Sequence, residues 1–147
     1  MLKKIIGNLY LGNHHTVLND NLLIKNKIHT VINCTRNKYN INHKIVNEIS
    51  FPSYDPPTNE DFISIIIGLD KILTLIDTLI NKDKRIIIFC HKGQQRSVTL
   101  CIAYLVYHFN IKSKVALHII KHIHPESFSH VGKSTLYLLK YFDMKYT

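Results

Sequence analysis

The most constraining feature of the sequence is an uninterrupted apolar run that begins after Arg85 and ends at Phe89. Its length is that of a strand, and a strand that is apolar at every position is buried on both faces. Burial on both faces is typical of a mainly parallel sheet that lies between helices. The run therefore predicts a parallel strand inside an α/β domain.

Segments with strand-like and helix-like patterns alternate along the rest of the chain. Apolar residues three or four positions apart predict a long helix over residues 60–82. Pro56 and Pro57 predict a loop over residues 53–59, because paired prolines interrupt helices and central strands. The other elements are a hairpin around Gly7 and Asn8, helices over 20–27, 96–109, 113–123 and 132–142, and strands over 30–34 and 44–51. The pattern predicts one α/β domain over residues 1–147, with a mostly parallel sheet of about five strands flanked by helices.

The composition fits one globular domain, since 46% of the 147 residues are hydrophobic and 20% are charged. This excludes a disordered tail, and the length excludes a two-domain dinucleotide-binding enzyme. The net charge of +9 indicates an anionic partner, and phosphate groups, nucleic acid or a membrane surface would all fit. Ile, Lys and Asn, all with A/T-rich codons, make up 52 residues, so much of the lysine excess reflects codon bias. The three arginines are therefore more informative: Arg36, Arg85 and Arg96.

The cysteines indicate the compartment, because an odd and sparse set is not a disulfide framework. Cys34, Cys90 and Cys101 are the whole set. We expect a reducing compartment, which means the cytoplasm, or the host cytoplasm or virion if the chain is viral. No signal peptide is expected, and the apolar stretches are too short to span a bilayer.

The chemistry is concentrated in the loop that follows the apolar run, where Cys90 and Arg96 are separated by five residues. A loop between a buried strand and a helix can turn its amides inward and form an anion site at the helix N-terminus. Gly93 provides backbone freedom at the tip. A guanidinium such as that of Arg96 can bind two phosphate oxygens, and the same positive field stabilises a Cys90 thiolate.

This Cys-x5-Arg pattern, followed by Ser97, resembles the signature of the cysteine-dependent protein tyrosine phosphatases. The rest of the chain resembles their small dual-specificity branch, including its poxvirus members. The similar segments are residues 6–12, 31–35, 51–55 and 103–105, which resemble the opening strands, the first central strand, the acid loop and the helix behind the phosphate loop.

The resemblance implies a mechanism that needs neither metal nor cofactor. Cys90 would attack phosphorus and form a phosphocysteine, and Ser97 would donate a hydrogen bond to the departing thiolate. An aspartic acid would protonate the leaving oxygen and later activate water. Asn33 would brace the loop from the neighbouring strand. The phosphate would be held by the Arg96 side chain and by the loop residues His91, Lys92, Gly93, Gln94, Gln95 and Arg96.

Two residues compete for the role of the acid. Asp55 is favoured because Phe51 and Pro52 precede it in a Phe-Pro-x-x-Asp loop that resembles the family's acid loop. Asp61 is the alternative, although it also fits a first-turn helix charge. Phe89 departs from the family, which has His before the nucleophile, so reduced activity is an expectation as well.

Three other patterns have simpler interpretations. The stretch that begins at Gly132 mimics the end of a nucleotide P-loop, but the required glycine at position 127 is Ser127. His118, His122 and His124 lack the carboxylate or cysteine that would complete a zinc site, so we assign them to the surface. Arg36 fits equally a second phosphate contact or a solvated side chain.

The leading hypothesis is a metal-independent dual-specificity protein phosphatase that acts on phosphotyrosine and phosphoserine or phosphothreonine. Its partners would be phosphorylated proteins, while nucleic acid is possible but not favoured. One alternative is the same chemistry on an RNA 5′-triphosphate or a phosphoinositide. The other is a pseudophosphatase that binds phosphorylated partners without turnover, which only Phe89 supports.

Overall fold

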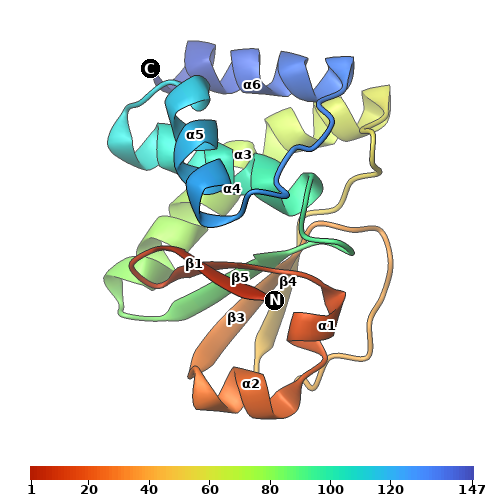
Figure 1. The fold of residues 1–147 in the computed structure, drawn as a ribbon, viewed down its shortest axis with the longest axis vertical. Helices are drawn as coiled ribbons and strands as arrows, with labels where there is room; N and C mark the ends of the chain where they lie inside the picture. Colours follow the sequence, from red (N-terminus) through yellow and green to blue (C-terminus); the bar gives the residue numbers. More distant parts are fainter.

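The computed structural model describes residues 1–147 and contains a five-stranded sheet with helices on both faces (Figure 1). The strand order is β1-β2-β5-β3-β4. β1 and β2 are antiparallel, and the other neighbouring pairs are parallel. The strands are β1 (Leu2–Ile6), β2 (Leu9–Gly12), β3 (Ile28–Asn33), β4 (Asn47–Ser50) and β5 (Arg85–Phe89). The predicted α/β fold with about five mostly parallel strands is confirmed.

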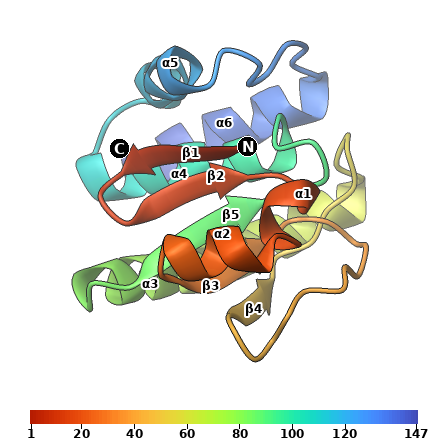
Figure 2. The same ribbon diagram turned by 60° about the horizontal axis from the view of Figure 1, so that its bottom comes forward.

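The helices form two unequal layers (Figures 1 and 2). On one face of the sheet lies a layer of four helices, three of which contact the strands while the C-terminal one packs against two of the others, and two short helices lie against the other face. The larger layer contains α3 (Asn59–Asn81), α4 (Arg96–Phe109), α5 (Ser113–Ile123) and α6 (Lys133–Tyr146), and the smaller contains α1 (His14–Val17) and α2 (Asp20–Lys25). The loop that leaves the carboxyl end of β5 therefore meets the N-terminus of α4, the helix at the centre of the larger layer.

The side chains of β5 show why an uninterrupted apolar run is needed there. Ile86 and Ile88 belong to the core between the sheet and the larger helical layer. Ile87 and Phe89 point to the opposite face and belong to a second core under the smaller layer. All four are completely buried, as expected for a strand that is covered on both sides.

Two N-terminal details differ from the sequence-based expectations. The strand predicted over 44–51 begins only at Asn47, because the amides of Ile45 and Val46 both bond to the Asn42 carbonyl and form a turn. α1 was not predicted; it is a single turn whose N-cap, Asn13, accepts a hydrogen bond from the Thr16 amide. This turn lies beside the loop after β5, where the His14 amide donates to the carbonyl oxygen of His91.

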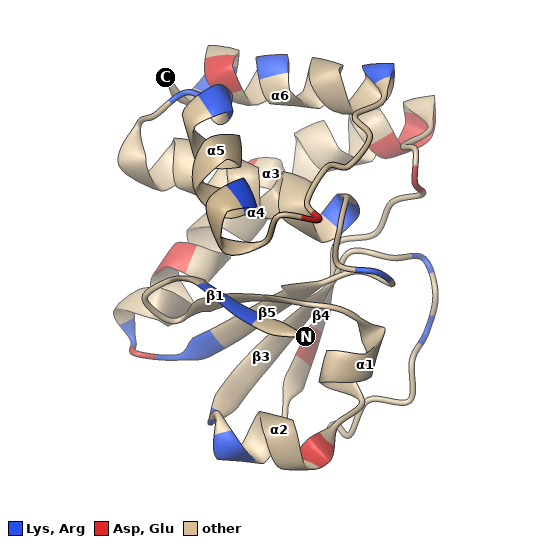
Figure 3. Cartoon of the chain, viewed as in Figure 1, with Lys and Arg blue, Asp and Glu red and all other residues tan.

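The basic residues are spread over many elements and do not gather on one face in the view of Figure 3. They lie on β1, α2, α5, α6 and several loops. The net charge therefore does not single out a nucleic-acid surface. No helix has both the length and the apolar character needed to cross a membrane.

Candidate active site

Cys90 follows β5 directly, and its thiol lies at the base of a hollow that we call the Cys90 cavity. The side chain is buried, and Sγ lies 3.1 Å from Oγ of Ser97 in the first turn of α4. The cavity has a volume of about 340 Å³. Its lining comes from the loop after β5 and from one acidic residue: Cys90, His91, Lys92, Gln94, Gln95, Arg96 and Asp55. The structure thus brings both ends of the Cys-x5-Arg pattern and the favoured aspartate to one cavity.

The loop over residues 90–95, here the Cys90 loop, has amide groups with no acceptor inside the protein. None of the amides of residues 91–98 donates a hydrogen bond to a backbone or side-chain atom. The N-cap of α4, Gln95, makes no side-chain capping bond, and the first turn holds no acidic residue. Unsatisfied donors at a helix N-terminus attract anions. The arrangement can therefore bind a phosphate group.

The carbonyl groups of the Cys90 loop, in contrast, are tied to other parts of the chain. They accept hydrogen bonds from residues before and after the loop: His91 from the His14 amide (3.2 Å), Gly93 from His124 Nε2 (3.0 Å) and Gln94 from the Phe128 amide (3.0 Å). Because the carbonyl of one residue and the amide of the next belong to the same planar peptide unit, these contacts fix the directions of the following amides as well.

Gly93 is required at the tip of the loop for two reasons. Its φ of +70° lies in the left-handed region, which side chains with a Cβ rarely adopt. A Cβ at this position would also lie 2.7 Å from the carbonyl oxygen of Gly12. The loop tip therefore packs directly onto the end of β2, and the predicted role of Gly93 as a source of backbone freedom is confirmed.

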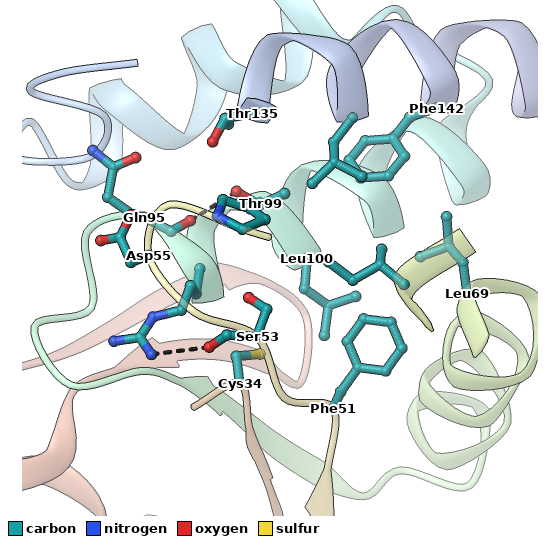
Figure 4. A pocket seen from close by; sticks show the side chains of 14 residues that line it. Cys34, Phe51, Ser53, Asp55, Leu69, Gln95, Thr99, Leu100, Thr135 and Phe142 are labelled. Atoms are coloured by element: carbon teal, nitrogen blue, oxygen red, sulfur yellow. Dashed lines mark hydrogen bonds between the residues drawn. The ribbon is translucent and has the colours of Figure 1, made fainter. Parts of the chain in front are cut away.

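Arg96 connects the Cys90 loop to the loop over residues 51–58, here the Asp55 loop. Its Nη1 donates to the carbonyl oxygen of Ser53 at 3.1 Å, the dashed line in Figure 4. Its Nε is buried and has no acceptor in the protein. Arg96 also lines a smaller hollow of about 30 Å³, to which Cys34, Ser53 and Asp55 contribute as well (Figure 4). The guanidinium is thus fixed at one nitrogen and keeps another donor for an anion.

The two candidate acids have very different surroundings. Asp55 lines the Cys90 cavity together with Cys90 and Arg96. Asp61 is fully buried and accepts hydrogen bonds from Arg36 and from the amides of Tyr54 and Thr58. Burial raises the pKa of Asp61, but these hydrogen bonds outweigh it and lower the pKa to about 2. Asp61 is therefore an ionised structural group with no proton to donate near neutral pH.

Comparison with known proteins agrees with this geometry. Residues 9–144 match the family model described as the dual specificity phosphatase catalytic domain. The chain belongs to the dual-specificity phosphatase family. A bovine relative, dual specificity protein phosphatase 18, is 32% identical over 110 residues, which cover 73% of this chain and 55% of the relative. Human dual specificity protein phosphatase 8 is 29% identical over 125 residues, which cover 84% of this chain and 19% of the relative. The chain thus spans about half or less of these relatives.

Solved structures of dual-specificity phosphatases have the same fold. Human DUSP28 superposes with a TM-score of 0.84 at 17% identity, covering 97% of this chain and 93% of that one. The human tyrosine phosphatase-like serine/threonine/tyrosine-interacting protein gives a TM-score of 0.84 at 18% identity, covering 99% and 97%. At these identities the likeness concerns the fold alone.

Phe89, which stands where this phosphatase family has His, points away from the Cys90 cavity into the second core. Tyr39 packs edge-on against it, with ring centroids 5.8 Å apart, and its hydroxyl lies 3.0 Å from Nδ1 of His91. The His91 ring stacks on His14 at 3.9 Å. Desolvation is the largest cause that lowers the pKa of His91, and electrostatic repulsion from the neighbouring cationic groups lowers it further. Aromatic residues from outside the Cys90 loop therefore hold its first residues on this side.

Three expectations about individual residues need correction. Asn33 does not reach the Cys90 loop, because its side chain bonds to Thr35, the Asn37 carbonyl and Glu48 around the end of its own strand. His124 is not a surface residue, since it is buried against Gly93. Arg36 is not free in solvent, because it forms an ion pair with Asp61 at 2.6 Å.

Proposed function

We propose that the chain is a metal-independent protein phosphatase that hydrolyses phosphotyrosine and phosphoserine or phosphothreonine through a phosphocysteine intermediate. One observation carries the proposal: a buried thiol, Arg96 with its unpartnered Nε, and loop residues whose amides are free line the same cavity as Asp55. A thiol nucleophile, donors for three phosphate oxygens and an acid are the groups that such a transfer requires.

In the first step the thiolate of Cys90 attacks phosphorus, and the bond between phosphorus and the substrate oxygen breaks. The amides of the Cys90 loop and Arg96 bind the non-bridging oxygens, where charge accumulates in the transition state. Asp55 transfers its proton to the leaving oxygen, so that an alcohol or phenol departs rather than an anion. The products of this step are phosphocysteine and the Asp55 carboxylate.

In the second step a water molecule attacks the phosphocysteine. The Asp55 carboxylate takes a proton from the water as its oxygen bonds to phosphorus, and the bond to sulfur breaks. Ser97 lies at hydrogen-bond distance from Sγ and donates to the thiolate as it leaves. Inorganic phosphate is released, and both side chains return to their starting states.

The names of the relatives support protein substrates, since the bovine and human proteins are dual specificity protein phosphatases. A phosphoinositide substrate has weaker support: PTPMT1, crystallised in complex with PI(5)P, has the same fold at 18% identity. Cys34, Cys90 and Cys101 form no disulfide, which suits a reducing compartment such as the cytoplasm.

The test is hydrolysis of an aryl phosphate across pH with EDTA present. We expect turnover by the wild type, none by Cys90→Ser, and loss of the basic limb of the pH profile in Asp55→Asn. Full activity in Asp55→Asn would remove Asp55 from the mechanism. No turnover by the wild type, with phosphopeptide still bound, would make the chain a phosphopeptide-binding module. Faster release from triphosphate-ended RNA or inositol lipids than from phosphopeptides would change the substrate class.

A further inference from the structure

The loop that carries Asp55 is held at the two residues just before it. Arg96 donates to the carbonyl oxygen of Ser53, and the amide of Tyr54 donates to Oδ2 of Asp61 at 2.9 Å. The Asp55 side chain makes no hydrogen bond, and it contributes to the lining of the Cys90 cavity and of the smaller hollow shown in Figure 4. The position of its carboxyl group therefore depends on how firmly the preceding peptide is fixed.

Asp61 is built to fix that peptide. Its side chain is fully buried in the first turn of α3, and both of its oxygens are engaged. Oδ2 accepts from the amides of Tyr54 and Thr58, and Oδ1 accepts from Arg36 at 2.6 Å. Thr58 completes a capping box with Asp61, so the carboxylate is also tied to the start of the long helix. A buried, fully bonded carboxylate is a rigid anchor.

Arg36 neutralises the charge of the Asp61 carboxylate, and it also contacts the Asp55 loop directly. It lies after β3, in a different part of the chain from the Asp55 loop. Its guanidinium stacks over the ring of Tyr54, with the central carbon 4.6 Å from the ring centroid. Tyr54 is thus held through its backbone by Asp61 and through its ring by Arg36. Together these contacts restrain both the backbone and the side chain of the residue that precedes Asp55.

We propose that Arg36 and Asp61 are positioning residues that place Asp55 for proton transfer, acting through Tyr54. This inference rests on the proposed phosphatase function and adds residues that the Cys-x5-Arg pattern does not contain. A shift of about 1 Å in a catalytic group can lower a rate roughly 100-fold, so loosening this grip affects the step that needs the proton. A purely structural role would lower stability without changing which substrates are hydrolysed.

The experiment compares two substrates that differ in their need for an acid. Phenyl phosphate has a leaving oxygen like that of tyrosine, with a pKa of about 10, and depends on protonation. p-Nitrophenyl phosphate has a much better leaving group and depends on it little. The quantity measured is kcat/KM for each, because it includes the step in which the leaving group departs. Arg36→Met removes the ion pair and keeps an apolar chain against Tyr54. Arg36→Lys is the milder variant and keeps the charge without the planar stack.

We expect Arg36→Met to lower kcat/KM about 10- to 100-fold for phenyl phosphate and less than about 3-fold for p-nitrophenyl phosphate. In Arg36→Lys the loss of kcat/KM should again be greater for phenyl phosphate than for p-nitrophenyl phosphate, but the difference should be smaller than in Arg36→Met. In Asp55→Asn the difference should be larger. The basic limb of the pH profile with phenyl phosphate should weaken in parallel. The matched control is Arg85→Met, which removes an arginine bonded only to the Asn26 carbonyl, away from the Cys90 cavity.

Equal losses on both substrates, or none, in a folded Arg36→Lys or Arg36→Met would overturn the inference and leave Arg36 a structural residue. Thermal unfolding identifies any variant that has lost its fold. If Arg36→Met is unfolded, the comparison of the two substrates with Arg36→Lys alone tests the inference. Failure of the proposed function looks different, because the wild type and Arg85→Met would then turn over neither substrate.

Discussion

His124 Nε2 lies 3.0 Å from the carbonyl oxygen of Gly93, so a residue just after α5 holds the tip of the Cys90 loop. The imidazole is buried, and its other nitrogen lies 3.1 Å from the Glu126 carboxylate. A neutral or a protonated ring can make the bond to Gly93, provided that Nε2 carries the proton. The contact orients the peptide that presents the next amide to the cavity.

The first prediction concerns this contact. His124→Leu leaves a buried carbonyl without a donor, which costs about 1–2 kcal/mol and loosens the loop. We expect inhibition by orthovanadate, a phosphate mimic, to weaken roughly 5- to 30-fold. His124→Gln, whose amide can donate from a similar position, should keep most of the affinity, and His118→Leu on the exposed side of α5 should keep all of it. Unchanged vanadate inhibition in His124→Leu would show that the loop does not need this bond.

The second prediction compares two glycines that both have a positive φ. Gly93→Ala places a Cβ 2.7 Å from a backbone oxygen, whereas Gly7→Ala, at a φ of +52°, meets nothing within 4 Å. Both variants should lose about 1 kcal/mol or more of stability through backbone strain. Only Gly93→Ala should lose activity and vanadate binding, because only its clash moves the loop. Equal activity in the two variants would contradict the packing of the loop tip on Gly12.

The third prediction concerns the second chemical step. Ser97→Ala removes the hydroxyl that lies 3.1 Å from the Cys90 sulfur, so the thiolate leaves without a charge-assisted hydrogen bond. Such bonds contribute about 1.5–3 kcal/mol, so hydrolysis of the phosphocysteine should slow about 10- to 100-fold. Rapid-mixing kinetics with p-nitrophenyl phosphate should then show a burst of nitrophenol followed by slow turnover. A uniform slowing without a burst would place the effect of Ser97 before the intermediate.

The fourth prediction follows from the lowered pKa of Asp61. Its pKa is about 2 in the folded chain and 3.8 in a free side chain, so the ionised form favours folding. The stabilisation is complete above about pH 5 and is lost as the pH falls towards 2. Asp61→Asn should lower the free energy of unfolding by about 1–3 kcal/mol at pH 6. Urea denaturation should show this difference shrinking between pH 5 and pH 2, and a constant difference would mean that ionisation of Asp61 does not stabilise the fold.

The sequence predicts the features of this chain that depend on local pattern. Short stretches of sequence are enough to predict the apolar strand β5 and the Cys-x5-Arg loop with its glycine. They also predict the helix over 60–82, whose observed ends differ by one residue. Asp55 could be preferred over Asp61 from its flanking Phe and Pro, and the cavity lining agrees with that preference. Each of these features is predicted by a pattern whose successive residues lie within about one helical turn or one loop of each other.

The contacts that hold the site in place could not be predicted in the same way. His124 is 31 residues from Gly93, and Arg36 is 25 residues from Asp61, so no local pattern pairs them. In a chain with ten histidines, a single buried one has no distinguishing signal. Phe89 gives an indirect indication, because it replaces the polar residue that the family has before the nucleophile. The replacement indicates that other residues hold the loop, but it does not identify Tyr39 as one of them.

The shape of the Cys90 loop is assembled from segments that span most of the chain. His14 and Tyr39 contact it from the N-terminal third, Arg96 is anchored to Ser53, and His124 and Phe128 hold it from near the C-terminal end. During synthesis, therefore, the nucleophile leaves the ribosome well before the residues that complete its surroundings. A chain that has been made only as far as α4 has the thiol but lacks the contacts from His124 and Phe128 that hold its loop. The Cys90 loop thus reaches its final shape only after residues as far along the chain as Phe128 have been made.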